Sequence, residues 1–471
     1  MIGFTNITEE AELANTQPDT KLDIQALRAE LTGELLTTES AGYHECRRMH
    51  DPTIDNRPGV IVRAASAKDV ATVVGYASRA GLPVAARSGG HGLSDDMFVD
   101  VAIMVDLSLL KGVSINADEG TARVQAGATS GDLAGPAHAH GLALTTGDTS
   151  SVGIGGLATG GGIGFMVRKF GLTIDNLISA EVVTADGSIL TASETENADL
   201  FWAIRGGGGN FGIVTEFEFR LARVGQILGG AIVFPATREV VRGYVDYAPD
   251  APEDLTTIGE LVLAPPAPFI PAEWVGKPVF LTLVCWTGAI EEGEKALEPL
   301  RKLATPVVDI VAPMPYPAIY NLTAEAAVPH GNSVRSLFQR EISDECIDKM
   351  IAAMPAAKAM MNMVQIRGLG GALAAVPAEG TAFSDRDARY LTTVIAVWAD
   401  ENEDATPHRD WIRSLYDQIK HEASGVYVNF LETETYDRIQ ECYGENFERM
   451  VELKRRYDPA NMFRFNQNIK P

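Results

Sequence analysis

Residues 87–92 read RSGGHG and residues 151–164 read SVGIGGLATGGGIG, and these two stretches decide the fold of the chain. The first stretch follows a predicted strand at 84–87, and its paired glycines let the backbone approach a ligand with the N–H groups pointing inward. Such turns form anion-binding nests that suit a pyrophosphate. His91 in this turn is open to two interpretations at this point, a hydrogen-bonding loop residue or a group that contacts the ligand.

The second stretch contains a G-x-G-x-x-A pattern, with Asp175 about twenty residues further on, as in a dinucleotide-binding turn. The preceding segment argues against that interpretation, because TTGDTSS at 145–151 is a polar turn and not a buried strand. Seven glycines in the twelve positions 153–164 exceed what such a turn needs. We expect instead a backbone moulded closely against a large flat cofactor, and the glycine cluster at 206–212 supports the same expectation.

The length of 471 residues predicts two large units, because domains usually hold about 100–200 residues. Apolar residues at helical spacing predict helices over 22–36 and 67–80 in the first unit. From residue 224 the pattern predicts an antiparallel sheet with helices on one face. The predicted strands are 60–63, 84–87, 103–106, 122–126, 229–234, 256–263, 279–286, 363–369 and 390–398, with later helices at 291–303 and 344–353 and a hairpin excursion at 264–274.

The composition excludes several classes of protein. The formal charge of −24 makes nucleic acid and anionic membrane surfaces poor partners. The four cysteines are scattered without a CxxC pair, so we expect reduced thiols and no metal site. The N-terminal residues lack a signal-peptide pattern and no apolar run is long enough to cross a bilayer, so we expect a cytoplasmic protein.

Taken together, the motifs resemble the FAD-linked oxidases of the vanillyl-alcohol oxidase superfamily, and specifically the berberine bridge enzyme-like family. The resemblance covers nearly the whole chain, because a closing module at 427–469 follows the motifs. The five segments that match in order are RPGVIVRAASAKDV (57–70), RSGGHG (87–92), SVGIGGLATGGGIG (151–164), RKFGLTIDNLISAEVVTADG (168–187) and LFWAIRGGGGNFGIVTEFEF (200–219).

The resemblance implies an α+β, two-domain FAD-binding fold of the p-cresol methylhydroxylase type. The FAD-binding domain would span 1–222, the substrate domain 223–425, and a module at 426–471 would return to the FAD domain. The substrate domain would be an antiparallel sheet covered by helices. The residues expected to contact FAD are Arg87, Ser88, Gly89, Gly90, His91, Gly92, Leu93, Asp148, Thr149, Val152, Gly153, Gly155, Gly156, Gly161, Gly162, Gly164, Asn176, Gly212, Ile213, Val214, Asn466 and Gln467.

His91 matches the histidine that relatives bond to the 8α-methyl group of the flavin, so the resemblance implies a covalent 8α-histidyl FAD. Many relatives carry a second bond, to a cysteine four residues before the first glycine of the long run. That position holds Thr149 here, so we predict a single covalent bond. Val152 occupies the position that controls access of dioxygen in relatives, where valine is typical of oxidases.

The catalytic base is less clear from the sequence. Relatives that oxidise alcohols often use the tyrosine of an N-Y-x-D motif, but residues 429–432 are NFLE, and Phe430 cannot accept a proton. If this segment is a strand, Tyr427 points away from the flavin unless a bulge intervenes. Thr393 is the other candidate. Five further side chains are candidates for the substrate pocket, with a core or surface position as the commoner alternative for each: Tyr316, Tyr320, Gln365, Arg367 and Trp398.

The leading hypothesis is an oxidase that moves hydride from a small alcohol or sugar to covalently bound flavin, with dioxygen as acceptor and hydrogen peroxide as product. Oxidation of a C–N bond, as in hydroxynicotine oxidases, is the close alternative, because an amine lone pair stabilises the cation without a base. A flavin-dependent dehydrogenase, or a flavin-binding protein without oxidase activity, is a further alternative. We expect a monomer or a homodimer.

Overall fold

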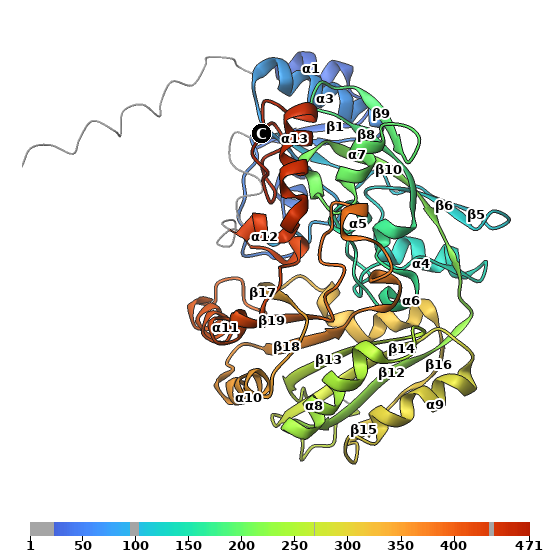
Figure 1. The fold of residues 1–471 in the computed structure, drawn as a ribbon. Helices are drawn as coiled ribbons and strands as arrows, with labels where there is room; N and C mark the ends of the chain where they lie inside the picture. The colour runs from blue at the N-terminus through green and yellow to red at the C-terminus, as the bar shows by residue number, and fades with distance from the viewer. Residues whose placement is uncertain (1–22, 95–102, 268, 433–437) are drawn as a thin grey trace, which may run out of the picture.

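The computed structural model describes residues 23–94, 103–267, 269–432 and 438–471 (Figure 1). The first sheet has four strands in the order β1-β2-β4-β3, with β4 parallel to both neighbours β2 and β3. Helix α3 (Ala67–Ala80) packs on it through buried valines, as the helical spacing predicted. The Ser66 side chain caps this helix, and Gly81 ends it in the left-handed conformation (φ 66°). The strands are β1 (Glu34–Thr37), β2 (Val60–Arg63), β3 (Val84–Arg87) and β4 (Ile103–Asp106).

The helix predicted over 22–36 is wrong in its second half. Helix α1 ends at Glu30 (Ile24–Glu30), and the chain then becomes the edge strand β1. The Asp69 carboxylate accepts the N–H groups of Thr32 and Gly33, which holds this segment extended. A Cβ on Gly33 would lie 2.0 Å from the carbonyl oxygen of Arg63, because this segment runs close against β2. Pairing of β1 with β2 therefore overrides the helical spacing here.

The second sheet is antiparallel and has five strands in the order β5-β6-β10-β8-β9. The short helices α4 (Ser130–His138), α5 (Ile154–Gly160), α6 (Val167–Phe170) and α7 (Ala198–Ile204) surround it. A polar segment precedes α5, as predicted, so the glycine run does not open a classical dinucleotide-binding turn. The strands are β5 (Val113–Asn116), β6 (Thr121–Gln125), β8 (Leu177–Val183), β9 (Ile189–Ser193) and β10 (Ile213–Arg220), and β7 (Leu142–Ala143) pairs separately with β11 (Ala222–Arg223).

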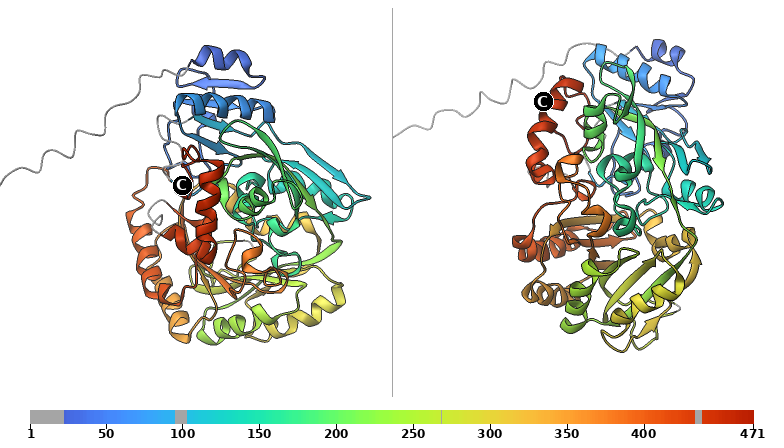
Figure 2. Two further views of the ribbon diagram at one scale, coloured as in Figure 1. Left: turned by 45° about the horizontal axis from the view of Figure 1, so that its top comes forward. Right: turned by 45° about the vertical axis from the view of Figure 1, so that its right-hand side comes forward.

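The third sheet has eight strands and is antiparallel throughout, as the pattern after residue 224 predicted. Four helices cover the face that points away from the N-terminal unit (Figures 1 and 2). In the described ranges, no helix has the length and apolar character needed to cross a membrane. The strands are β12 (Gln226–Pro235), β13 (Leu255–Leu263), β14 (Pro278–Trp286), β15 (Val308–Asp309), β16 (Ala312–Pro315), β17 (Gly331–Gln339), β18 (Met361–Gly368) and β19 (Tyr390–Trp398), and the helices are α8 (Arg238–Tyr247), α9 (Ile290–Arg301), α10 (Asp344–Ala353) and α11 (Thr406–Ile419).

A buried arginine ties this large sheet to the N-terminal unit. Arg168 on α6 is 2% exposed, and its guanidinium donates only to backbone carbonyls. A guanidinium carries five N–H donors in a rigid fork, so one side chain can hold several loops at once. The accepting carbonyls belong to Pro249, Ala251, Leu255 and Leu369.

The C-terminal segment returns to the N-terminal unit through α12 (Ile439–Tyr443) and α13 (Phe447–Tyr457), as Figure 2 shows. The fully buried Lys454 on α13 donates to the carbonyls of Asn210 and Phe463, both at 2.9 Å, and to the carboxylate of Asp458 at 2.7 Å. The Asn210 side chain accepts the N–H of Ile469 at 2.9 Å. These bonds fasten the tail to the glycine loop at 206–212.

Replacement of Lys454 by methionine tests how much the fold depends on this buried ammonium. The variant leaves the Asp458 carboxylate buried without its counter-charge, so we expect a loss of about 3–5 kcal/mol in the free energy of unfolding. The measurement is urea denaturation followed by circular dichroism. Lys302→Met is the matched control, because Lys302 and Glu298 form the same i,i+4 pair at 2.8 Å on the surface. Equal stability of the two variants would contradict the prediction.

Candidate active site

A cavity of about 440 Å³ lies where the N-terminal glycine loops, the C-terminal tail and the large sheet meet. Its lining includes most of the residues that the sequence predicted at the cofactor and the substrate. The predicted residues that line it are Arg87, Ser88, Gly89, Gly90, His91, Gly92, Leu93, Asp148, Thr149, Val152, Gly153, Gly155, Gly156, Gly212, Ile213, Val214, Gln365, Arg367, Thr393, Tyr427, Phe430, Asn466 and Gln467.

The two glycine loops touch each other backbone to backbone at Gly89 and Gly153. A Cβ on Gly89 would lie 2.4 Å from the nitrogen of Gly153, and a Cβ on Gly153 would lie 2.2 Å from the nitrogen of Gly89. Real Cβ atoms do not approach so closely, so both positions require glycine. The Ser88 hydroxyl donates to the carbonyl of Ala126 at 2.5 Å and holds the first loop against the five-stranded sheet.

Four residues predicted at the cofactor lie outside the lining of the cavity. A Cβ on Gly162 would meet Thr173 Oγ1 at 2.1 Å, and one on Gly164 would meet the carbonyl oxygen of Thr146 at 1.8 Å. Gly161 faces Phe383 and Tyr427, and Asn176 donates to the carbonyls of Phe170 and Leu172. The density of glycine in this run therefore serves close packing of protein on protein at these positions.

Other glycines leave open space that a bound group can fill. A Cβ on Gly156 or on Gly208 would meet no atom within 4 Å, and both residues line the cavity. Asn466 Oδ1 is buried there without a hydrogen-bond partner among the described residues. A cradle of bare backbone with unsatisfied polar atoms fits an elongated polar cofactor such as FAD.

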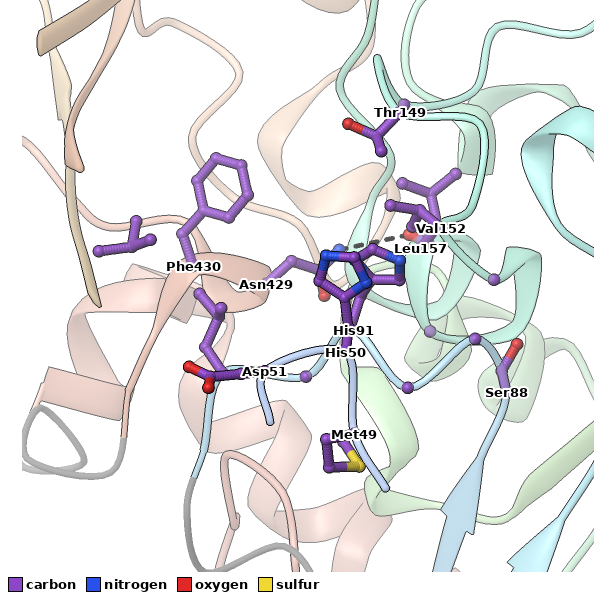
Figure 3. Close-up of a pocket in the computed structure, with 18 of the residues that line it drawn as sticks. Met49, His50, Asp51, Ser88, His91, Thr149, Val152, Leu157, Asn429 and Phe430 are labelled. Atoms are coloured by element: carbon purple, nitrogen blue, oxygen red, sulfur yellow. Dashed lines mark hydrogen bonds between the residues drawn. The ribbon is translucent and has the colours of Figure 1, made fainter. Parts of the chain in front are cut away.

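Three histidines gather at one place in the cavity, and Figure 3 shows two of them, His50 and His91. The His50 ring stacks on the His91 ring with centroids 3.9 Å apart and planes at 21°, and the His330 ring meets His50 edge-on at 5.0 Å. His91 Nε2 lies 2.9 Å from Ser151 Oγ. Burial lowers the pKa of His91 to about 3 and that of His50 to about 4, with neighbouring positive charge acting in the same direction. Both imidazoles are therefore neutral at pH 7.

A polar network crosses from the N-terminal unit to the large sheet. Arg367 on β18 pairs with the Asp148 carboxylate at 2.5 Å and donates to Gln365 Oε1 at 2.9 Å. Gln365 in turn donates to Glu260 on β13 at 2.7 Å. Burial raises the pKa of Glu260 to about 7, so this carboxyl changes its protonation near neutral pH.

The chain at Tyr427 differs from the strand that we predicted. Residues Val428–Phe430 form a 3₁₀ turn, so side chains do not alternate between two faces. Tyr427, Asn429 and Phe430 consequently all line the same cavity, and the expectation that Tyr427 points away from it is wrong. The Tyr427 oxygen accepts the N–H of Gly162 and the amide of Asn429, both at 3.0 Å.

Three of the expected pocket residues lie elsewhere. Trp398 is fully buried and stacks on His408, and Tyr316 and Tyr320 pack in a separate core with the Tyr320 hydroxyl on Thr146. Met49, His50 and Asp51 also line the cavity, although no sequence motif marks them. They reach the cavity because the His50 N–H donates to the carbonyl of Gly90 at 2.8 Å, a contact 40 residues apart in sequence. Phe463 and Phe465 of the tail, which the sequence did not predict at the site, line it as well.

Comparison with known proteins agrees with this geometry. Residues 58–193 match the FAD binding domain family, and residues 426–470 match the berberine and berberine-like family. An uncharacterized FAD-linked oxidoreductase of Bacillus subtilis (strain 168) is 31% identical over 94% of this chain and 98% of its own length. The chain belongs to the berberine bridge enzyme-like FAD-linked oxidoreductases. It is therefore an oxidoreductase that binds FAD.

Named relatives of this berberine bridge enzyme-like protein act on different substrates. (R)-6-hydroxynicotine oxidase of Paenarthrobacter nicotinovorans is 30% identical over 94% of this chain and 97% of its own. The structure of 6-hydroxy-D-nicotine oxidase from Arthrobacter nicotinovorans covers 97% of this chain and 100% of its own with a TM-score of 0.82 and 26% identity. The structure of glucooligosaccharide oxidase from Acremonium strictum is described with a 6-S-cysteinyl, 8α-N1-histidyl FAD. It covers 95% of this chain and 99% of its own, with a TM-score of 0.85 and 27% identity. These neighbours confirm the predicted α+β fold of the p-cresol methylhydroxylase type.

Two alanine substitutions distinguish glycines that pack from glycines that face the cavity. Gly153→Ala places a Cβ on the backbone of Gly89, so we expect little folded protein and no bound flavin. Gly156→Ala, the matched control in the same glycine run, meets no protein atom, so the flavin-free variant should fold and melt at the temperature of the flavin-free wild type. Melting curves and the ratio of flavin to protein absorbance are the measurements. A stable, flavin-loaded Gly153→Ala variant would contradict the contact.

Proposed function

We propose that this protein is an FAD-dependent oxidase that takes hydride from a small alcohol or sugar and passes the electrons to dioxygen, giving hydrogen peroxide. The observation that carries the proposal is a single cavity lined both by the glycine loops around His91 and by Gln365, Arg367 and Thr393 of the large sheet. Bound FAD supplies the hydride acceptor in such a site. The sheet residues supply hydrogen-bond donors and acceptors to an oxygen-bearing substrate.

We further propose that FAD is held by one covalent bond, to His91. Burial lowers the pKa of His91 to about 3, so its imidazole is neutral at pH 7. A neutral imidazole carries a free lone pair, which a nucleophile needs. Thr149 lines the same cavity at the position where many relatives have a second linking cysteine. Its hydroxyl donates to Asp148 at 3.2 Å and offers no thiolate.

Tyr427 is the proposed catalytic base for an alcohol substrate. Its oxygen accepts two hydrogen bonds, from Gly162 and Asn429, and N–H donors stabilise a phenolate over a phenol. Burial nevertheless raises the pKa of Tyr427 overall, so the active phenolate gains population as the pH rises. Thr393 is fully buried and its hydroxyl has no partner in the described part of the chain, which suits a hydrogen bond to substrate better than proton abstraction.

Amine oxidation is a second candidate function, supported by Phe430 and the apolar part of the lining. Phe430 stands in the cavity where alcohol-oxidising relatives carry the tyrosine base, and Met361, Met363 and Ile395 add apolar surface. An amine can lose hydride without a base. Similarity to a hydroxynicotine oxidase over 94% of the chain supports this candidate.

Val152 supports dioxygen as the electron acceptor. It lines the cavity in the second glycine loop, at the position where valine is typical of oxidases in this family. Reduced enzyme mixed with air-saturated buffer should return rapidly to the oxidised absorbance spectrum and release one peroxide per flavin. Slow reoxidation would instead support the dehydrogenase alternative.

The substrate class is tested by a panel of small alcohols, oligosaccharides and cyclic secondary amines, with bleaching of flavin absorbance as the readout. For an alcohol substrate, Tyr427→Phe should lower kcat/KM by about 10²–10⁴-fold, the usual contribution of a general base. Wild-type turnover should rise with pH toward the raised pKa of Tyr427. For an amine substrate, the variant should stay within a few-fold of wild type.

Tyr244→Phe is the matched control for this panel, because Tyr244 is another fully buried tyrosine with a bonded hydroxyl, outside the cavity lining. Its kcat/KM should match the wild type. Unchanged alcohol turnover in Tyr427→Phe would remove Tyr427 as the base. Absence of bleaching by every compound would support a flavin-binding protein without oxidase activity.

The covalent bond is tested by acid precipitation of the purified holoenzyme. We expect yellow flavin to stay with the protein pellet, whereas His91→Ala should release it into the supernatant because the attached nitrogen is gone. His138→Ala is the control, since His138 ends helix α4 away from the cavity lining. Free flavin in the wild-type supernatant would overturn the proposed bond.

A further inference from the structure

His50 is held in place on both sides of its ring. Its backbone N–H donates to the carbonyl of Gly90 at 2.8 Å, directly before His91. One side of the ring covers His91 at a centroid distance of 3.9 Å (Figure 3), and the His330 ring packs against it edge-on. The His50 ring also makes a hydrogen bond to the backbone of Ala326, while its Nε2 atom has no partner among the described residues. This bond, the stack on His91 and the edge contact with His330 together fix the ring position.

The second contact that positions the His91 ring is with Ser151. A neutral imidazole has one N–H and one lone pair on its two nitrogens, and a hydrogen bond to one nitrogen selects the tautomer. The Ser151 hydroxyl lies 2.9 Å from Nε2. When Nε2 donates its proton to Ser151, the lone pair is on Nδ1. Ser151 stands directly before Val152 in the second glycine loop, so contact between the loops sets this distance.

We infer that His50 and Ser151 are positioning residues for flavin attachment: His50 fixes the plane of the His91 ring, and Ser151 holds Nε2, so that Nδ1 is the linking atom. This inference rests on the proposed covalent bond to His91. It adds which neighbours hold the His91 ring for that bond; attachment through N1 of the histidine is the form described for the glucooligosaccharide oxidase neighbour. Ser151 is the first residue of the second glycine motif, whereas His50 lies outside every motif that predicted the cofactor contacts.

The attachment balances with dioxygen as the oxidant. One bond forms, between Nδ1 of His91 and the carbon of the methyl group at position 8 of the flavin, and one C–H bond of that methyl group breaks. The imidazole also gives up its N–H proton. The two electrons and two protons released in this way leave as hydrogen peroxide, so the flavin ends in its oxidised form.

Attachment is measured on the full-length chain produced under limiting riboflavin and then supplied with FAD. Acid-precipitable flavin is followed with time, and the linked peptide is analysed by nuclear magnetic resonance to identify the bonded nitrogen. His50→Ala should attach flavin about 10²-fold more slowly, the loss typical of a reacting group displaced by about 1 Å. His50→Phe keeps a stacked ring, so it should restore most of the rate.

Ser151→Ala should give a mixture of Nδ1 and Nε2 linkage, because the tautomer is no longer selected. Melting curves and binding of FAD before attachment show whether each variant is folded, so a slow variant that binds FAD supports the inference. Wild-type rates in His50→Ala, or an Nε2 bond in the wild type, would overturn it and leave the proposed function intact. A wild-type protein that never retains flavin in acid would overturn the proposed bond itself.

Discussion

The contact between the backbones of Gly89 and Gly153 is the constraint on which the site depends. It brings the loop after β3 of the four-stranded sheet against the loop that opens α5 beside the five-stranded sheet. No side chain fits between Gly89 and Gly153, so the two loops approach as closely as two backbones can. The cavity forms beside this contact, and the distance between His91 and Ser151 follows from it.

Two buried cations hold the other two parts of the chain that line the cavity, the C-terminal tail and the large sheet. Lys454 fastens the C-terminal tail to the glycine loop at 206–212, which places Asn466 and Gln467 in the lining. Arg168 fastens the large sheet to the N-terminal unit through backbone carbonyls. Each cation gathers acceptors that lie far apart in sequence, so three segments of chain are held as one site. Burying either cation without its acceptors would cost folding free energy. The folded state therefore requires these particular contacts.

The chemistry of the site follows from what this packing does to protonation and hydrogen bonding. Burial keeps His91 and His50 neutral, as an attacking imidazole must be. The 3₁₀ turn at Val428–Phe430 brings Tyr427 and Phe430 into one cavity, so a proton-accepting phenol and an apolar ring face the same substrate space. The substrate class depends on which of these two side chains meets the reacting carbon, and alcohols and amines differ in their need for the phenol.

The sequence by itself determined the family, the α+β fold, FAD as the cofactor and nearly half of the cavity lining. It could do so because five motifs in order resemble those of a known family, while strand and helix periodicity marked many of the individual elements. Only the tertiary structure decided the roles of individual glycines, since Gly153 and Gly164 are needed for contacts with residues distant in sequence, while Gly156 faces open space. The same holds for the 22–36 segment, where pairing with β2 and the Asp69 carboxylate outweighed helical spacing. It also holds for His50, which no motif marks and which reaches His91 only through a backbone bond to Gly90. Stacking, burial and tautomer selection are contacts between distant segments, and a linear pattern does not encode them.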